Sequence, residues 1–114
     1  MIERLYHITF PVSDTKRTVA FYENILGLKK RGEWPNYAEF DVGEVHFGFE
    51  QKGKLEIFLL VDDVDKAYES LKKKGVKFVT EPKDMHWGAR AATFVDPDGN
   101  MFTIEHFKKE KSRT

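Results

Sequence analysis

Hydrophobic and polar positions alternate over residues 5–12, which predicts a β-strand with one buried face. Apolar positions at helical spacing then predict a helix from about Thr15 to Leu26, with Gly27 as its C-terminal stop. The residues expected on its buried face are Val19, Tyr22 and Leu26, with Ile25 beside them. Three short strands are predicted next, at about 28–34, 37–42 and 45–51.

The same order of elements starts again at Leu55. An apolar strand at 55–61 precedes an amphipathic helix that Gly75 ends. The apolar face of this helix carries Val64, Ala67, Tyr68 and Leu71. The remaining segments are predicted as a strand at 76–80, a loop at 81–88, strands at 89–95 and 100–107 joined by a turn at 96–99, and a solvated tail at 108–114.

The chain therefore contains a strand-helix-three-strand unit twice. HITFPVSD at 7–14 aligns with EIFLLVDD at 56–63, a shift of 49 residues. Sequence identity between the two halves is low, so the prediction of a repeat rests on the repeated order of strands and helices. We expect one domain over 1–114, with modules at about 1–53 and 54–107.

Strand periodicity sorts the side chains into two faces. One face is apolar and is expected to pack on the helices; it carries Ile8, Phe10, Val12, Phe47, Phe49, Ile57, Leu59, Val61, Phe102 and Ile104. The opposite face carries His7, His46, Gly48, Glu50, Glu56, Met101, Thr103, Glu105 and Phe107. Such a mixed face either meets solvent or lines a polar cleft, and the apolar side chains on it favour a cleft.

Composition narrows the function classes. Nineteen basic and nineteen acidic residues cancel, so no overall field attracts nucleic acid or an anionic membrane. Without cysteine there is no thiolate nucleophile and no Cys-based metal site. The longest strictly apolar run, 57–61, is far shorter than the roughly 20 residues of a spanning helix. We expect a cytoplasmic protein without nucleic-acid or membrane partners.

Several segments together resemble the vicinal oxygen chelate superfamily, which groups glyoxalase I, bleomycin-resistance proteins, fosfomycin-resistance enzymes and extradiol dioxygenases. The resemblance covers nearly the whole chain and rests on HITFPVSD, FYENILGL, VDDVDKAYESLKKKGV, the WG at 87–88 and FVDPDGNMFTIE. It implies an α+β fold in which two repeated modules form a curved mixed sheet around a cleft, with helices on the outer face. It also implies a small-molecule ligand and a homodimer.

In metal-using members of this family, divalent-cation ligands come from the first and last strand of each module. The positions that match are His7, Gly48, Glu56 and Thr103. An imidazole and a carboxylate suit Zn, Ni, Fe or Mn, whereas Gly48 has no side chain and Thr103 is a poor ligand. The chain departs from the metal pattern at these two positions.

Two acidic residues on the same face offer a replacement. Glu50 and Glu105 lie two residues further along the strands, so His7, Glu56 and Glu105 form the predicted metal set. Glu50 and Glu105 are the predicted catalytic carboxylates, and Glu50 or His46 is a fourth ligand or a base. Alternatively, His7 and Glu56 form a buried ion pair that needs no metal.

Substrate contacts are expected from the rest of the polar face and from the loop at 81–88. The predicted substrate-binding residues are His46, Phe58, Trp87, Arg90, Met101 and Thr103. Two alternatives stay open for members of this set: Arg90 forms a surface ion pair, and Trp87 belongs to a plain loop.

Two functions of different classes fit these residues. The first is a divalent-metal-dependent, glyoxalase-like lyase or isomerase that acts on a small oxygenated substrate. The second is a metal-free protein that sequesters an aromatic or cationic drug-like compound, which an acidic cleft with aromatic walls would bind by charge and stacking.

Overall fold

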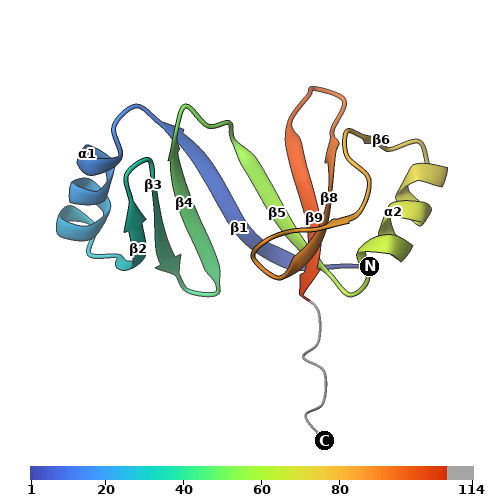
Figure 1. Cartoon of the computed structure of the whole chain (residues 1–114), viewed down its shortest axis with the longest axis horizontal. Coiled ribbons are helices and arrows are strands. Elements are labelled where there is room, and N and C mark those ends of the chain that lie inside the picture. The colour runs from blue at the N-terminus through green and yellow to red at the C-terminus, as the bar shows by residue number, and fades with distance from the viewer. Residues whose placement is uncertain (108–114) are drawn as a thin grey trace, which may run out of the picture. The chain divides into compact units, whose positions relative to one another are not determined.

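The structure is a computed structural model that describes residues 1–107; the predicted solvated tail at 108–114 lies outside the described residues. The chain divides into two compact units (Figure 1). The first unit is Leu5–Phe58, and the second comprises Met1–Arg4 and the chain from Leu59 onward. Among residues 1–107, none of the helices combines the length and the hydropathy needed to cross a membrane.

The first unit is a mixed sheet with one helical segment. Its strands lie in the order β2-β3-β4-β1; β1 runs parallel to β4, and the other neighbours are antiparallel. The elements are β1 (Ile2–Val12), α1 (Thr15–Val19), η1 (Ala20–Ile25), β2 (Lys29–Trp34), β3 (Tyr37–Val42) and β4 (Val45–Gln51). The predicted strands are confirmed, those at 37–42 and 45–51 with the same bounds, and β1 begins three residues earlier than expected.

The helical segment of the first unit differs from the prediction in its second half. Asp14 caps α1 by accepting a hydrogen bond from the Arg17 N–H at 3.2 Å. From Ala20 the helix becomes a π-helix, and the Leu26 N–H bonds the carbonyl five residues back at 3.0 Å. This wider turn rotates the later side chains off the buried face. Ile25 and Leu26 are 72% and 52% exposed, so their predicted place on that face was wrong.

Aromatic packing holds the first unit together. The Phe49 ring lies 4.4 Å from that of Tyr22 and 5.6 Å from that of Phe10, both nearly parallel to it. The buried core residues are Val19, Ala38, Phe40 and Phe49, with Phe10, Val12, Tyr22, Leu28 and Phe47 packed against them. Each fully buried ring contributes roughly 1.5–3 kcal/mol to stability. The predicted helix-facing side of β1 and β4 is thus confirmed for Phe10, Val12, Phe47 and Phe49.

The second unit repeats the strand order of the first. Its strands lie in the order β6-β8-β9-β5, which corresponds to β2-β3-β4-β1, and the short β7 also pairs with β8. The elements are β5 (Glu56–Val61), whose residues up to Phe58 are counted with the first unit, α2 (Val64–Lys73), β6 (Lys77–Phe78), β7 (Lys83–Asp84), β8 (Ala89–Val95) and β9 (Met101–Phe107). The predicted α+β fold of two repeated modules is confirmed.

Helix α2 packs its predicted face on this sheet. The core of the second unit consists of Val61, Val64, Ala67, Tyr68, Ala92 and Ile104. Asp63 caps the helix through the Lys66 N–H at 3.1 Å, and His106 Nδ1 accepts the Val64 N–H at 2.8 Å. His106 therefore helps to cap the N-terminus of α2.

The connection from α2 to β8 is more irregular than predicted. The strand expected at 76–80 is only two residues long, because the Val79 and Thr80 N–H groups both bond the Thr93 carbonyl, at 2.8 and 3.2 Å, and the chain bends there. The expected loop at 81–88 contains the short strand β7. The chain then turns back over β8, on which β7 pairs (Figure 1).

Candidate functional site

His7 lies at the centre of the polar side of the first unit. The residue is 8% exposed, and its Nε2 lies 3.0 Å from the Thr9 hydroxyl oxygen. Its Nδ1 lies 3.8 Å from a Glu39 carboxylate oxygen, and the Phe58 ring meets the imidazole edge-on at 5.1 Å between centroids. Burial lowers the pKa of His7 to about 4, and the Glu39 charge only partly opposes this. His7 is therefore neutral at neutral pH.

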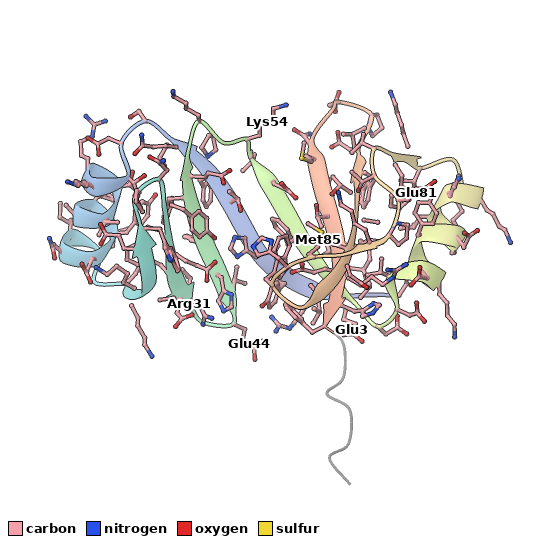
Figure 2. The ribbon with its side chains drawn as sticks, in the orientation of Figure 1. Glu3, Arg31, Glu44, Lys54, Glu81 and Met85 are labelled. Carbon is pink, nitrogen blue, oxygen red and sulfur yellow. The ribbon has the colours of Figure 1, made fainter. Side chains whose placement is uncertain are left out.

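Glu39 is held by two donors of its own unit. The Tyr37 hydroxyl donates to it at 2.7 Å, and Arg31 Nε donates to the other carboxylate oxygen at 3.1 Å. Arg31 lies on β2 at a register shift between Lys30 and Gly32, and its side chain is labelled in Figure 2. Burial and the bond to Glu39 raise the pKa of Tyr37 far above its usual range, so its hydroxyl remains a donor.

Gly48 forms the base of this cluster. It is buried on β4, between Thr9 of β1 and Glu39 of β3. A Cβ atom at this position would lie 2.5 Å from the Tyr37 hydroxyl oxygen and 2.7 Å from His7 Nε2. The missing side chain is therefore what lets His7 and Tyr37 approach each other. We call His7, Thr9, Tyr37, Glu39 and Arg31, with Gly48 beneath them, the His7 network.

Trp87 and Glu105 form a second pair, in the second unit. Glu105 on β9 is 2% exposed, and it accepts the Trp87 indole N–H at 3.3 Å. The indole itself is 44% exposed, and the His86 ring meets it edge-on at 4.9 Å between centroids. The loop that carries it is tight, because the Met85 N–H bonds the Ala89 carbonyl at 2.7 Å. Figure 2 marks Met85 in this loop. An exposed aromatic surface is thus anchored on a buried carboxylate.

Other predicted site residues of the second unit are engaged locally. The Arg90 guanidinium donates to both Asp65 carboxylate oxygens, at 2.7 and 2.9 Å, and to Asp84 at 3.2 Å. The Thr103 hydroxyl lies 2.7 Å from that of Thr93. Met101 is half-buried at the start of β9. Arg90 therefore has the ion pairs of the alternative prediction, while its role toward a substrate stays a prediction.

The predicted site residues fall into two groups, one in each unit. The rings of His46 and Phe58 both lie next to His7, with 6.2 Å between the His7 and His46 ring centroids. Glu50 is exposed on β4, and Glu56 is half-buried on β5. The predicted metal set of His7, Glu56 and Glu105 draws on both units and stays a prediction.

Four members of the His7 network were missed by sequence reasoning: Thr9, Tyr37, Glu39 and Arg31. A signal existed for three of them. Ala38 and Phe40 mark the buried face of β3, so Tyr37 and Glu39 must face the other way. Thr9 follows His7 by two residues and shares its face. The partners of Arg31 had no such signal, because the register shift between Lys30 and Gly32 changes which residues of β3 lie opposite β2.

Comparison with known proteins places this arrangement in a family. The family model described as "Glyoxalase/Bleomycin resistance protein/Dioxygenase superfamily" matches residues 4–104. The chain belongs to this superfamily. The resemblance seen in the sequence is thereby confirmed.

Similar proteins include one that is uncharacterized and two that are named as enzymes of different activities. "Uncharacterized protein YraH" of Bacillus subtilis is 38% identical over an alignment of 125 positions, which covers 89% of this chain and 96% of that protein. "Metallothiol transferase FosB" of Lysinibacillus sphaericus is 26% identical, covering 96% and 93%. "Lactoylglutathione lyase" of Neisseria meningitidis is 29% identical, covering 94% and 91%.

Solved structures support the same fold. The hypothetical protein BH1468 of Bacillus halodurans has a TM-score of 0.77 at 22% identity, over 97% of this chain and 98% of that chain. An Mn(II)-bound glyoxalase of Novosphingobium aromaticivorans also has a TM-score of 0.77, at 23% identity, over 98% of this chain and 43% of that chain. At these sequence identities the structural similarity establishes the glyoxalase-like fold alone.

The superfamily includes metal-dependent enzymes, and the residues present here do not fit a metal centre as they stand. His7 Nε2 is bonded to Thr9, Glu105 accepts from Trp87, and position 48 has no side chain. Within either unit, over residues 1–107, no three His, Cys, Asp or Glu side chains lie close enough together to hold an ion. Structural and catalytic metal sites usually need three or four protein ligands.

Proposed function

We propose that this protein binds a planar, cationic aromatic small molecule, with Trp87 as the stacking surface and Glu105 as its buried counter-charge. The observation that carries the proposal is the hydrogen bond from the exposed indole to the buried carboxylate. Membership of a superfamily that includes bleomycin-resistance proteins supports a binding role.

The chemistry of this pair favours a cation over a neutral ligand. Indole is the best aromatic partner for a cation, and such contacts contribute about 0.5–2 kcal/mol, more when they are desolvated. The Glu105 carboxylate is 2% exposed, so water screens its charge weakly. The bond to Glu105 also fixes the plane of the Trp87 ring, which lowers the entropy lost when a flat ligand stacks on it.

The His7 side of the first unit has candidate ligand contacts of its own, separate from those at Trp87. Phe58 and His46 present rings beside His7, and we propose both as ligand-contacting residues. Assembly as a homodimer in the cytoplasm belongs to the same proposal. None of these contacts requires a metal ion.

A second candidate function is a divalent-metal-dependent lyase or isomerase. The similarity to FosB and to lactoylglutathione lyase favours it. In this alternative His7, Glu56 and Glu105 hold the ion, and Glu50 and Glu105 are the catalytic carboxylates. It requires His7 and Glu105 to leave the hydrogen bonds that they make to Thr9 and Trp87.

Calorimetry on chelator-treated, tag-free protein tests the proposal. A planar aromatic cation such as ethidium is titrated into the protein, into Trp87→Leu and into Trp34→Leu. Trp34 is the matched control because it is a comparably exposed tryptophan of the other unit, 54% against 44%. We expect binding that is at least ten-fold weaker in Trp87→Leu and unchanged in Trp34→Leu. Equal binding by all three proteins contradicts the proposal.

Metal analysis separates the two candidates. Protein purified without an affinity tag is assayed for Zn, Ni, Fe and Mn before chelation. The metal-free function predicts no stoichiometric metal. Stoichiometric metal that is lost in His7→Ala would favour the enzyme instead.

A further inference from the structure

Gly48 lies directly beneath the His7 imidazole, in the unit that does not contain Trp87. We infer that Gly48, together with Tyr37, withholds the His7 imidazole from divalent cations, and that position 48 decides whether the first unit can bind a metal ion. The inference rests on the mismatch between the His7 network and the metal use of superfamily members. It concerns the first unit alone and does not depend on Trp87.

There is no room for a side chain at position 48. A Cβ at position 48 would approach the Tyr37 hydroxyl oxygen to 2.5 Å, His7 Nε2 to 2.7 Å and Tyr37 Cε1 to 3.0 Å. The backbone of Gly48 does not have the positive φ of Gly27 or Gly43, so the need for glycine comes from space. Any side chain at position 48 must displace His7, Tyr37 or both.

The His7 imidazole offers a single lone pair, and its neighbours favour the tautomer in which Thr9 uses it. A neutral imidazole has one N–H and one lone pair. If Thr9 donates to Nε2, the lone pair is used there, and the Nδ1–H faces Glu39. The opposite tautomer, with Nε2 donating to Thr9, would turn the Nδ1 lone pair toward the acceptor-only carboxylate oxygens of Glu39, so the first arrangement is the favourable one.

The hydrogen bonds of the His7 network are complete within the first unit. Over residues 1–107, every buried side-chain nitrogen and oxygen has a hydrogen-bond partner. The Phe58 ring packs against the imidazole edge-on. A metal ion would have to break at least one of these hydrogen bonds and would find too few ligands in return.

Replacing Gly48 by a carboxylate residue should free the His7 imidazole and add a metal ligand beside it. A glutamate places a hard ligand beside His7, and its Cβ displaces the imidazole from Thr9. Tyr37→Phe removes the hydroxyl oxygen, which is the atom that the new Cβ would approach most closely. The double variant Gly48→Glu/Tyr37→Phe should therefore bind a divalent cation. Gly48→Ala/Tyr37→Phe is its matched control, because it adds the Cβ without a ligand.

Co²⁺ is the probe for these variants, because its visible absorption reports coordination directly. We expect Gly48→Glu/Tyr37→Phe to bind Co²⁺ at least ten-fold more tightly than both the unmodified protein and the alanine control. Adding His7→Ala should abolish the gain. A folded glutamate variant that binds no more tightly than the control overturns the inference, and so does a gain that survives His7→Ala.

The unmodified protein provides a test that does not depend on the folding of a variant. Its His7 ring resonances are followed by NMR during titration with Zn²⁺. Unchanged His7 signals support the inference, and a saturable Zn²⁺-dependent shift of these signals overturns it. Binding of the aromatic cation at Trp87 is measured separately in chelated protein, so failure of the proposed function and failure of this inference are distinguishable.

Discussion

Trp87 donates its indole N–H to the carboxylate of Glu105 over 3.3 Å, although Trp87 is 44% exposed and Glu105 only 2%. The bond joins a loop to the last strand of the second unit. It positions an aromatic ring at the surface against a buried carboxyl group. This relationship separates ring stacking from charge, so each contribution can be removed by itself.

Glu105→Gln removes the charge and keeps an oxygen that can accept the indole N–H. We expect the affinity for an aromatic cation to fall several-fold, while the affinity for a neutral aromatic of the same size is unchanged. Calorimetry with both ligands measures the difference. An equal loss for the two ligands would mean that Glu105 acts through packing and not through its charge.

Gly48→Ala is predicted to destabilise the protein by about 1–3 kcal/mol, because its Cβ overpacks a buried site. Tyr37→Phe alone removes a hydrogen bond and should cost about 1 kcal/mol. Together they should cost less than the sum, since the closest contact of the new Cβ is the oxygen that Tyr37→Phe removes. Urea unfolding of the four proteins gives the coupling, and strict additivity would contradict the described packing.

Acid should destabilise the protein through His7. The folded state holds the pKa of His7 at about 4, below its usual 6.5, so the unfolded chain binds more protons between these values. The free energy of unfolding therefore falls as the pH drops from about 6.5 to about 4, by on the order of 3 kcal/mol.

Replacement of His7 by Gln should remove most of this pH dependence. His86→Gln is the control, because His86 is exposed, and it should leave the slope unchanged. Urea unfolding at pH 7.0 and at pH 4.5 gives the comparison for each protein. The same slope in His7→Gln as in the unmodified chain would show that another group causes the acid sensitivity.

Much of the fold could be predicted because strand periodicity and glycine stops are local signals. The strand pairs at 37–42 and 45–51 and at 89–95 and 100–107, and the face of α2, follow directly from them. The repeat was predicted from the order of elements, and the matching strand orders of the two units confirm it. The change from α- to π-helix at Ala20 could not be predicted, because the apolar spacing used for the prediction assumes a regular α-helix.

The site was harder to predict because its chemistry depends on cross-strand distances. That His7 meets Glu39 follows from the β1-β4-β3 register and from the space above Gly48, neither of which sequence spacing contains. The pairing of Trp87 with Glu105 depends on how the loop after β7 turns back. Residue types on one strand face were predictable; their partners on other strands were not.

The π-helix leads to a stability prediction of its own. Ile25→Ala should change the free energy of unfolding by less than about 0.5 kcal/mol, because the side chain is 72% exposed. Val19→Ala should lower the free energy of unfolding by about 2 kcal/mol, because Val19, at the end of α1, is only 6% exposed. Thermal or urea unfolding compares the two, and a regular α-helix that buries Ile25 would make both variants costly.

The most direct test of the central claim uses Trp87 as its own reporter. In chelator-treated Trp34→Phe protein, Trp87 is the only remaining tryptophan, because the sequence contains two. Titration with ethidium should quench its fluorescence saturably, with a midpoint that matches calorimetry and rises at least several-fold on adding Glu105→Gln. Quenching that does not saturate, or a midpoint that Glu105→Gln leaves unchanged, would contradict a metal-free cation site at Trp87 and Glu105.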